Sequence, residues 1–345
     1  MNPVLPARFP LQALAAAAAI ASGVLLTACG GGGDPAPPTT TTPLSQSDAA
    51  ADSANASSTG YDTATALDTV IDTTSALALA TASTSSAPSD REQALSVSAS
   101  AAAGVTNVTV SCAGGGTATL SITGGTAASE LNGQLDAGEH YSVAYAQCTG
   151  AAGYAQLNGN VEMDVASADH TTSPASVAVN LTVTGLALSL PAGSATLNGT
   201  ASVSRSVAST GGTTTTTSHV TVPSATLATA FYSRSGSFTL SVLDATRTLS
   251  SVASVATASQ YNGHHTLSGT ANGRTFSMTV ATTGNVSYDA TGALVSGAWT
   301  VVRPHATVAT TVANGTVIVT VDDGNDGTID HTWTFPLAQL GAAAG

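Results

Sequence analysis

The chain contains no lysine and only seven arginines in 345 residues, against 20 acidic residues. P-loop enzymes, PLP enzymes and S-x-x-K acyl enzymes each need a lysine, so these three classes are excluded. Seven scattered arginines cannot neutralise a phosphate backbone, so a nucleic-acid partner is excluded as well. Because only 8% of the residues are charged, the net charge of −13 indicates a weakly charged, mildly acidic surface.

Catalytic signatures and aromatic residues are scarce too. The strings H-E-x-x-H, G-x-S-x-G and C-x-x-C do not occur, which excludes the zinc, hydrolase and redox sites that they mark. Aromatic residues make up 4% of the chain, so a core would consist mainly of Val, Leu and Ala. We find no catalytic constellation and predict a protein that is not an enzyme. A dispersed pair of carboxylates in a cleft is the enzymatic alternative.

The first residues have the layout of a secretory signal. Residues 1–10 hold one cation, Arg8, and residues 11–28 carry no charge. A short charged region followed by an apolar helix-prone run is typical of a signal peptide. The run is rich in alanine and no basic cluster follows it, unlike a transmembrane anchor. Residues 1–28 are therefore predicted to be a signal peptide.

This signal ends in Leu26-Thr27-Ala28-Cys29, an apolar residue and two small residues before a cysteine. The motif resembles the lipobox of bacterial lipoproteins. The resemblance implies that Cys29 carries diacylglycerol and palmitate, and that the chain is anchored in the outer membrane because no Asp follows the cysteine. Several acyl chains anchor a protein stably, whereas one does not. The alternative is an ordinary secretory signal with a chance cysteine.

The segment after Cys29 has the composition of a linker. Glycines, prolines and threonines fill residues 30–43, and a run rich in Ser, Thr, Ala and Asp continues to about residue 87. Residues 29–88 are therefore predicted to be a disordered tether. Leu67, Val70 and Ile71 also have the spacing of a short amphipathic helix, so that alternative stays open.

Residues from about 104 onward read as strands. Short runs such as TVIVTVDD are rich in β-branched residues, alternate with period two and are separated by turn residues. The spacing is too short for βαβ units, so we predict an all-β fold with a large antiparallel meander sheet or sandwich over residues 104–337. Asn314-Gly315 predicts a type I′ hairpin. Residues 338–345 are expected to form a flexible tail.

Two further patterns concern local structure. The capping-box spacing of residues 89–92 predicts a short helix over 89–103. The sequence ATLNG at 195–199 repeats AQLNG at 155–159, and we interpret it as recurrent strand-and-bend chemistry, because a solenoid would keep a stricter period.

Cys112 and Cys148 are the cysteines that remain after Cys29. Two cysteines in an exported β-domain predict a disulfide, with two buried free thiols as the alternative. The layout of CAGGG, LDAG, cysteine and LNG resembles uncharacterised β-rich bacterial lipoproteins, a resemblance that implies no activity.

The densest acidic cluster runs from Asp322 to Asp330. Calcium takes six to eight oxygen ligands, and Asp322, Asp326 and Asp330 have a spacing similar to that of calcium loops. Gly324 replaces an expected ligand, so a glycine-rich hairpin turn is the alternative. The turn that holds Asp136 and Glu139 is a second acidic candidate, with a structural role as its alternative. No other cofactor is predicted.

The seven histidines do not form a recognisable metal site. His264 and His265 are adjacent, and adjacent side chains on a strand point to opposite faces. We therefore predict an envelope lipoprotein whose β-domain is structural or contacts a partner protein or glycan. A binding module for an apolar ligand or glycan is the alternative, favoured by the shared face of Tyr141, Val143 and Tyr145.

Overall fold

The structure is a computed structural model, and every structural statement below concerns the residues that it describes. These are residues 43–50, 52–53, 59–61, 63–64, 67–68, 70–71, 74, 97–102, 105–111, 115–125, 134–149, 156–190, 193–231, 234–252, 255–271, 274–290 and 293–342. The predicted signal peptide and Cys29 lie outside them. No helix within these residues is both long enough and apolar enough to cross a membrane.

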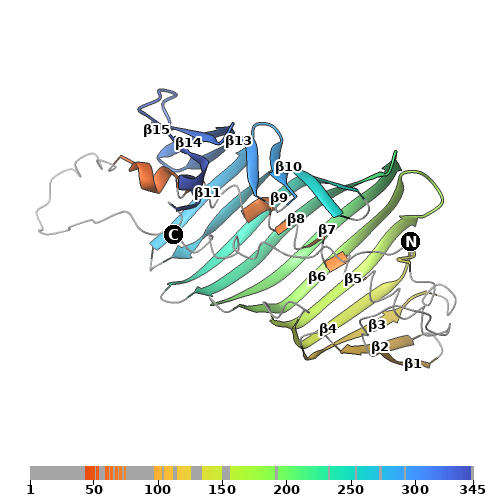
Figure 1. Ribbon diagram of the computed structural model, residues 1–345. Coiled ribbons are helices and arrows are strands. Elements are labelled where there is room, and N and C mark those ends of the chain that lie inside the picture. The colour runs from red at the N-terminus through yellow and green to blue at the C-terminus, as the bar shows by residue number, and fades with distance from the viewer. Residues whose placement is uncertain are drawn as a thin grey trace, which may run out of the picture.

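One antiparallel sheet of 16 strands forms the body of the protein (Figure 1). Each strand pairs with the next in the chain, except that β11 pairs with β13, and β12 pairs with β10 and β13. The predicted all-β fold with an antiparallel meander sheet is confirmed. The strands are β1 (Val97–Ala102), β2 (Val105–Ser111), β3 (Thr117–Thr123), β4 (His140–Thr149), β5 (Gln156–Asp169), β6 (Ala175–Leu190), β7 (Gly193–Thr210), β8 (Thr213–Phe231), β9 (Arg234–Val252), β10 (Val255–Ala271), β11 (Arg274–Thr282), β12 (Val286–Asp289), β13 (Leu294–Arg303), β14 (Ala306–Ala313), β15 (Thr316–Asp323) and β16 (His331–Pro336).

The strands form because apolar and polar residues alternate along them. In β15, Val317, Val319 and Val321 are fully buried on one face. Asn314 and Gly315 join β14 to β15 with positive φ angles of 51° and 73°. A type I′ turn requires positive φ at both central residues, so the predicted hairpin is confirmed.

The repeated Leu-Asn-Gly sequence marks two bends of the sheet. The Oδ1 atom of Asn158 accepts the backbone N–H of Gln147 at 2.8 Å, and that of Asn198 accepts the N–H of Gly185 at 2.6 Å. Gln147 and Gly185 both have positive φ, and each lies within a break in strand register. Each Asn therefore fixes a β-bulge in the preceding strand. Bulges bend and twist strands, and the long sheet curves accordingly (Figure 1).

An N-terminal segment packs on the apolar face of this sheet. We call it the inner segment and define it as the described residues between 43 and 74. Its residues are helical from 46 onward, and its pieces are the orange ones in Figure 1. Ala49, Ala64 and Ile71 are 0 to 1% exposed and belong to the same apolar core as the strands. The sheet therefore has one covered apolar face and one exposed polar face.

The inner segment crosses the strands in the reverse of their chain order. Ser53 shares a hydrogen bond of 2.6 Å with Thr310 of β14, and Tyr61 shares one of 2.9 Å with Ser259 of β10. Further along, Asp68 binds Arg247 of β9. This path agrees with a helix lying across the sheet.

The prediction of a disordered tether over 29–88 is therefore wrong for the described residues between 46 and 74. Leu67 and Ile71 are buried in helical backbone, as the amphipathic alternative predicts. Gly60 permits the close approach, because a Cβ atom there would overlap the hydroxyl oxygen of Tyr261. Many positions on the buried side of the inner segment hold Ala, Ser, Thr or Gly, and this composition resembles that of a linker.

Two other boundary predictions are also wrong. The helix predicted over 89–103 is replaced in its described part by β1, all six residues of which pair with β2. Pairing along the whole edge of a sheet outweighs a single capping-box match. The predicted flexible tail over 338–345 overlaps α2 (Leu337–Ala342), where Leu340 is buried in the core.

Candidate functional site

Only one of the three cysteines lies among the described residues. Cys148 is in β4, while Cys29 and Cys112 are outside the described residues. Ser111, the last residue of β2, pairs with Thr117 of β3, which pairs with Ala146 of β4. Ser111 thus lies at the end of the sheet where Cys148 lies. The disulfide between them stays a prediction.

The acidic loop from Asp322 to Asp330 is a hydrogen-bonded turn between β15 and β16. The carboxylate of Asp322 accepts the backbone N–H groups of Asp326 and Gly327, at 3.1 and 2.9 Å. The carboxylate of Asp330 accepts the N–H of Asp323 at 2.7 Å. Among the described residues, no group of three or more His, Cys, Asp or Glu side chains could hold a metal ion. Asp322, Asp326 and Asp330 are therefore not brought together as calcium ligands, and the glycine-rich turn is what the structure contains.

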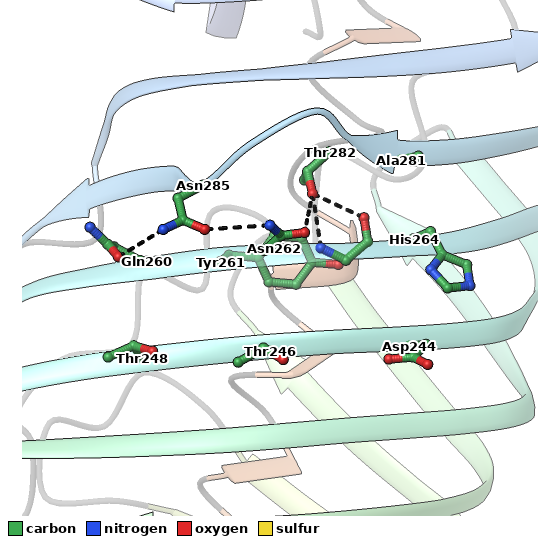
Figure 2. A pocket seen from close by; sticks show the side chains of 11 residues that line it. Asp244, Thr246, Thr248, Gln260, Tyr261, Asn262, His264, Ala281, Thr282 and Asn285 are labelled. Carbon is green, nitrogen blue, oxygen red and sulfur yellow. Dashed lines mark hydrogen bonds between the residues drawn. The ribbon is translucent and has the colours of Figure 1, made fainter.

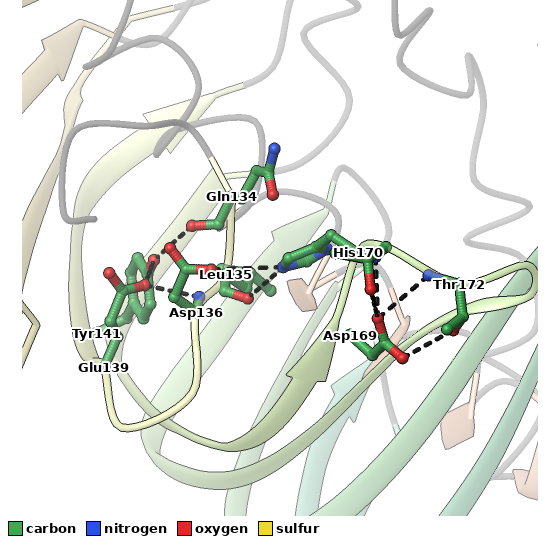
Figure 3. Close-up of polar contacts among 9 residues, drawn as sticks. Gln134, Leu135, Asp136, Glu139, Tyr141, Asp169, His170 and Thr172 are labelled. Atoms are coloured by element: carbon green, nitrogen blue, oxygen red, sulfur yellow. Dashed lines mark hydrogen bonds and ion pairs between the residues drawn. The ribbon is translucent and has the colours of Figure 1, made fainter. Parts of the chain in front are cut away.

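The turn that holds Asp136 and Glu139 is also structural (Figure 3). Glu139 is 1% exposed, and its Oε2 atom accepts the backbone N–H of Asp136 at 2.8 Å and the hydroxyl of Tyr141 at 2.5 Å. His170 approaches from the β5–β6 connection and lies 2.9 Å from the carbonyl oxygen of Leu135. These contacts fasten the turn to the sheet.

The aromatic face expected on β4 belongs to the core. Tyr141, Val143 and Tyr145 share one face, as predicted, but they are 0%, 1% and 8% exposed. Burial raises the pKa of Tyr145 to about 12. This face is covered and offers no stacking platform to a ligand.

Two ion pairs join the inner segment to the sheet. Arg247 Nη1 lies 2.8 Å from Asp68 Oδ2, and Arg303 Nη1 lies 2.6 Å from Asp52 Oδ2. Both aspartates are almost fully buried, as is Arg247. Arg247 also lies 5.7 Å from the ring centre of Tyr61, within cation–π range. The ion pairs fix the position of the inner segment on the apolar face.

Two buried groups in this region have shifted pKa values. Burial raises the pKa of Asp52 to about 6, although the adjacent Arg303 opposes the shift. Burial lowers the pKa of His265 to about 4, and the neighbouring His264 adds to that effect. His265 is 2% exposed whereas His264 faces outward, so the two histidines point to opposite faces as predicted.

These two pKa shifts predict opposite changes in the stability of the protein with pH, which largely cancel. Asp52 has a higher pKa folded than unfolded, so its contribution to stability falls by about 2 kcal/mol as pH rises from 4.5 to 6.5. His265 has a lower pKa folded than unfolded, so its contribution rises by about 2 kcal/mol over the same range. Urea unfolding should show that Asp52→Asn makes stability increase more steeply with pH than in the wild type. His265→Leu should make stability increase less steeply with pH than in the wild type. If neither variant changed the dependence of stability on pH, the two pKa shifts would be contradicted.

The exposed face carries rows of polar side chains that cross the strands. Neighbouring residues within a row are about 4.8 Å apart, the spacing between strands. Neither row contains Arg or Lys. One row runs from β3 to β10 through Thr123, His140, Asp164, Asn180, Ser202, Thr221, Asp244 and His264. The row beside it runs from β4 to β11 through Ser142, Glu162, Thr182, Thr200, Ser224, Ser241, Thr266 and Thr279.

A pocket of about 650 Å³ opens on this face over β9, β10, the end of β11 and Asn285, which precedes β12 (Figure 2). Its lining is polar and comes mainly from Asp, Thr, Gln, Asn and His side chains. Asp244 lies on one wall, where its Oδ1 atom is 2.8 Å from Nε2 of His219. Asn262 and Asn285 lie on the other wall. The sequence does not reveal this pocket, because its walls meet only through the sheet register.

The chain matches no protein-family model, no curated protein and no solved structure.

Proposed function

We propose that the protein is a lipid-anchored, non-catalytic lipoprotein of the outer membrane whose β-sheet contacts an envelope partner through its exposed face. One observation supports the contact surface above all others. The inner segment covers the apolar face, and the continuous polar rows therefore form the broad surface that remains for a partner. The anchor rests on the resemblance of residues 26–29 to a lipobox.

The alternative of an apolar ligand is less well supported. Ala49, Ala64 and Leu67 of the inner segment already pack into the apolar core of the sheet. An apolar ligand would have to displace them together with the ion pairs that hold them. A polar partner on the exposed face displaces only water.

Replacing Cys29 with serine tests the anchor. The wild-type protein is expected to incorporate an alkyne analogue of palmitate and to partition into the detergent phase of Triton X-114, because acyl chains bury methylene groups. Cys29→Ser is expected to lose the label and to leave the detergent phase. Cys148→Ser makes the same chemical change in β4 and should keep both properties. An unmodified amino terminus in the native mature protein, measured by mass spectrometry, would overturn the anchor.

Photo-crosslinking in intact cells tests the contact surface. A benzophenone amino acid at Ser204, exposed on β7, is expected to form an adduct with an envelope component. The same amino acid at Ala338, exposed on α2 away from the polar rows, is the matched control. Equal adduct yields at the two positions, or no adduct at Ser204, would overturn the exposed face as the contact surface.

A further inference from the structure

The pocket on the exposed face arises from a change of strand partner. β10 pairs with β11 as far as His264 and Ala281, and it pairs with β12 from Tyr261 and Val286. Between these points the ladder is interrupted and residues 283–285 cross from β11 to β12. The interruption leaves the hollow of about 650 Å³ in the middle of a polar face.

One wall of the pocket is a chain of hydrogen-bonded side chains (Figure 2). The hydroxyl of Thr282 lies 2.8 Å from Oδ1 of Asn262, to which it donates. The amide of Asn285 donates to Oε1 of Gln260 at 3.1 Å. These contacts hold three carboxamides in fixed positions before any ligand arrives, which lowers the entropy lost on binding.

The other wall offers unused hydrogen-bonding groups. The side chains of Thr246, Thr248 and His264 form no hydrogen bond to any other described residue. The Asp244 carboxylate contacts His219 through one oxygen, and it can accept further hydrogen bonds from a ligand in the pocket. Hydroxyl, imidazole, carboxamide and carboxylate groups therefore surround the hollow, with donors and acceptors intermixed.

The charge and position of this pocket exclude several ligand classes. No arginine lines it and the chain has no lysine, so phosphates and other anions lack a counter-charge. It lies in the interior of the sheet, so a peptide cannot add as an extra strand. Its lining is mainly polar, so an apolar ligand would leave hydrogen-bonding groups unpaired.

We propose that this pocket binds a neutral, hydroxyl-rich ligand, namely a segment of an uncharged polysaccharide. This inference rests on the proposed contact function of the exposed face and names its partner. A carboxamide pairs one donor and one acceptor with neighbouring sugar hydroxyls, and a carboxylate accepts two hydroxyl donors. The polar row that includes Asp244 and His264 continues across the sheet as far as β3, so a longer chain gains further weak contacts beyond the pocket.

Affinity electrophoresis of the full mature protein tests the proposal. The gels contain hydroxyethylcellulose, glycogen or galactomannan as neutral probes, or polygalacturonate as an acidic probe. The wild type is expected to be retarded by at least one neutral polysaccharide. Asn285→Ala is expected to weaken that retardation about tenfold, because it removes one wall contact and frees Gln260. Gln339→Ala removes an exposed carboxamide on α2, outside the pocket and both polar rows, and is expected to retain the affinity.

Three outcomes would overturn the proposal. These are no retardation by any neutral probe, equal weakening by Asn285→Ala and Gln339→Ala, and retardation by polygalacturonate as strong as that by the best neutral probe. Because Asn285 is exposed, its substitution should leave the thermal midpoint unchanged, which separates loss of binding from unfolding. If crosslinking at Ser204 persists without glycan binding, the contact function stands and the polysaccharide site alone fails.

Discussion

Replacing Arg247 with methionine is expected to lower the free energy of unfolding by about 3–5 kcal/mol. Arg247 and its partner Asp68 have side chains only 10% and 6% exposed. Removal of the guanidinium leaves the Asp68 carboxylate without its counter-ion in an apolar core. Urea unfolding gives the change in free energy, and hydrogen exchange of residues 59–74 should report a loosened inner segment.

The double variant Asp68→Leu/Arg247→Met provides the control. It removes both charges and fills their volume, and replacing a complete buried ion pair with apolar residues is often neutral. We therefore expect it to be more stable than Arg247→Met alone, and a double-mutant cycle should show strong coupling. Simple additivity of the two single changes would contradict a buried pair at this position.

Replacing Tyr61 with alanine is expected to destabilise the protein by a similar amount, about 3–5 kcal/mol. The Tyr61 ring is buried, stacks on Tyr288 with 3.8 Å between ring centres and meets Tyr261 edge-on at 6.2 Å. Its loss removes the largest side chain that the inner segment buries in the sheet. Urea unfolding measures the change, and limited proteolysis should cut Tyr61→Ala between residues 43 and 74 before the wild type.

Tyr61→Phe separates packing from hydrogen bonding. It keeps the ring and loses the contact of 2.9 Å with Ser259, so it should cost about 1 kcal/mol. Equal destabilisation by Tyr61→Phe and Tyr61→Ala would show that ring packing does not fix the inner segment.

Features with a local physical cause could be predicted from the sequence. Asn314-Gly315 makes its turn because both residues tolerate positive φ, and neighbouring Val runs alternate with polar residues. The two Leu-Asn-Gly repeats produce the same bend twice because the asparagine side chain acts within one pair of strands. Both interpretations need only a few residues of context.

The inner segment could not be recognised in the same way. Its buried side uses Ala, Ser and Thr at many positions, which carry little hydrophobic signal. Its ion pairs join residues far apart in sequence, since Asp68 and Arg247 are 179 positions apart and Asp52 and Arg303 are 251 positions apart. The positions of Arg247 and Arg303 in the sequence therefore do not reveal the aspartates with which they pair in the folded chain.

The candidate pocket depends on strand register as well. Asp244 and His264 face each other only because β9 and β10 pair with a bulge at this point. Asn285 joins them because β11 ends there and β12 begins. A sequence shows each of these polar residues on its own strand, but the register that aligns them is a property of the whole sheet.

The order of synthesis has a consequence for how this chain reaches its native state. Residues 43–74 leave the ribosome before any strand exists, yet Ser53 contacts Thr310, 257 residues later. Contacts of such long range form slowly, because loop closure must precede them. The inner segment thus cannot dock completely until the last hairpins of the sheet have been synthesised. Throughout that interval the nascent sheet exposes its apolar face, so the unfinished chain is prone to self-association until the inner segment docks.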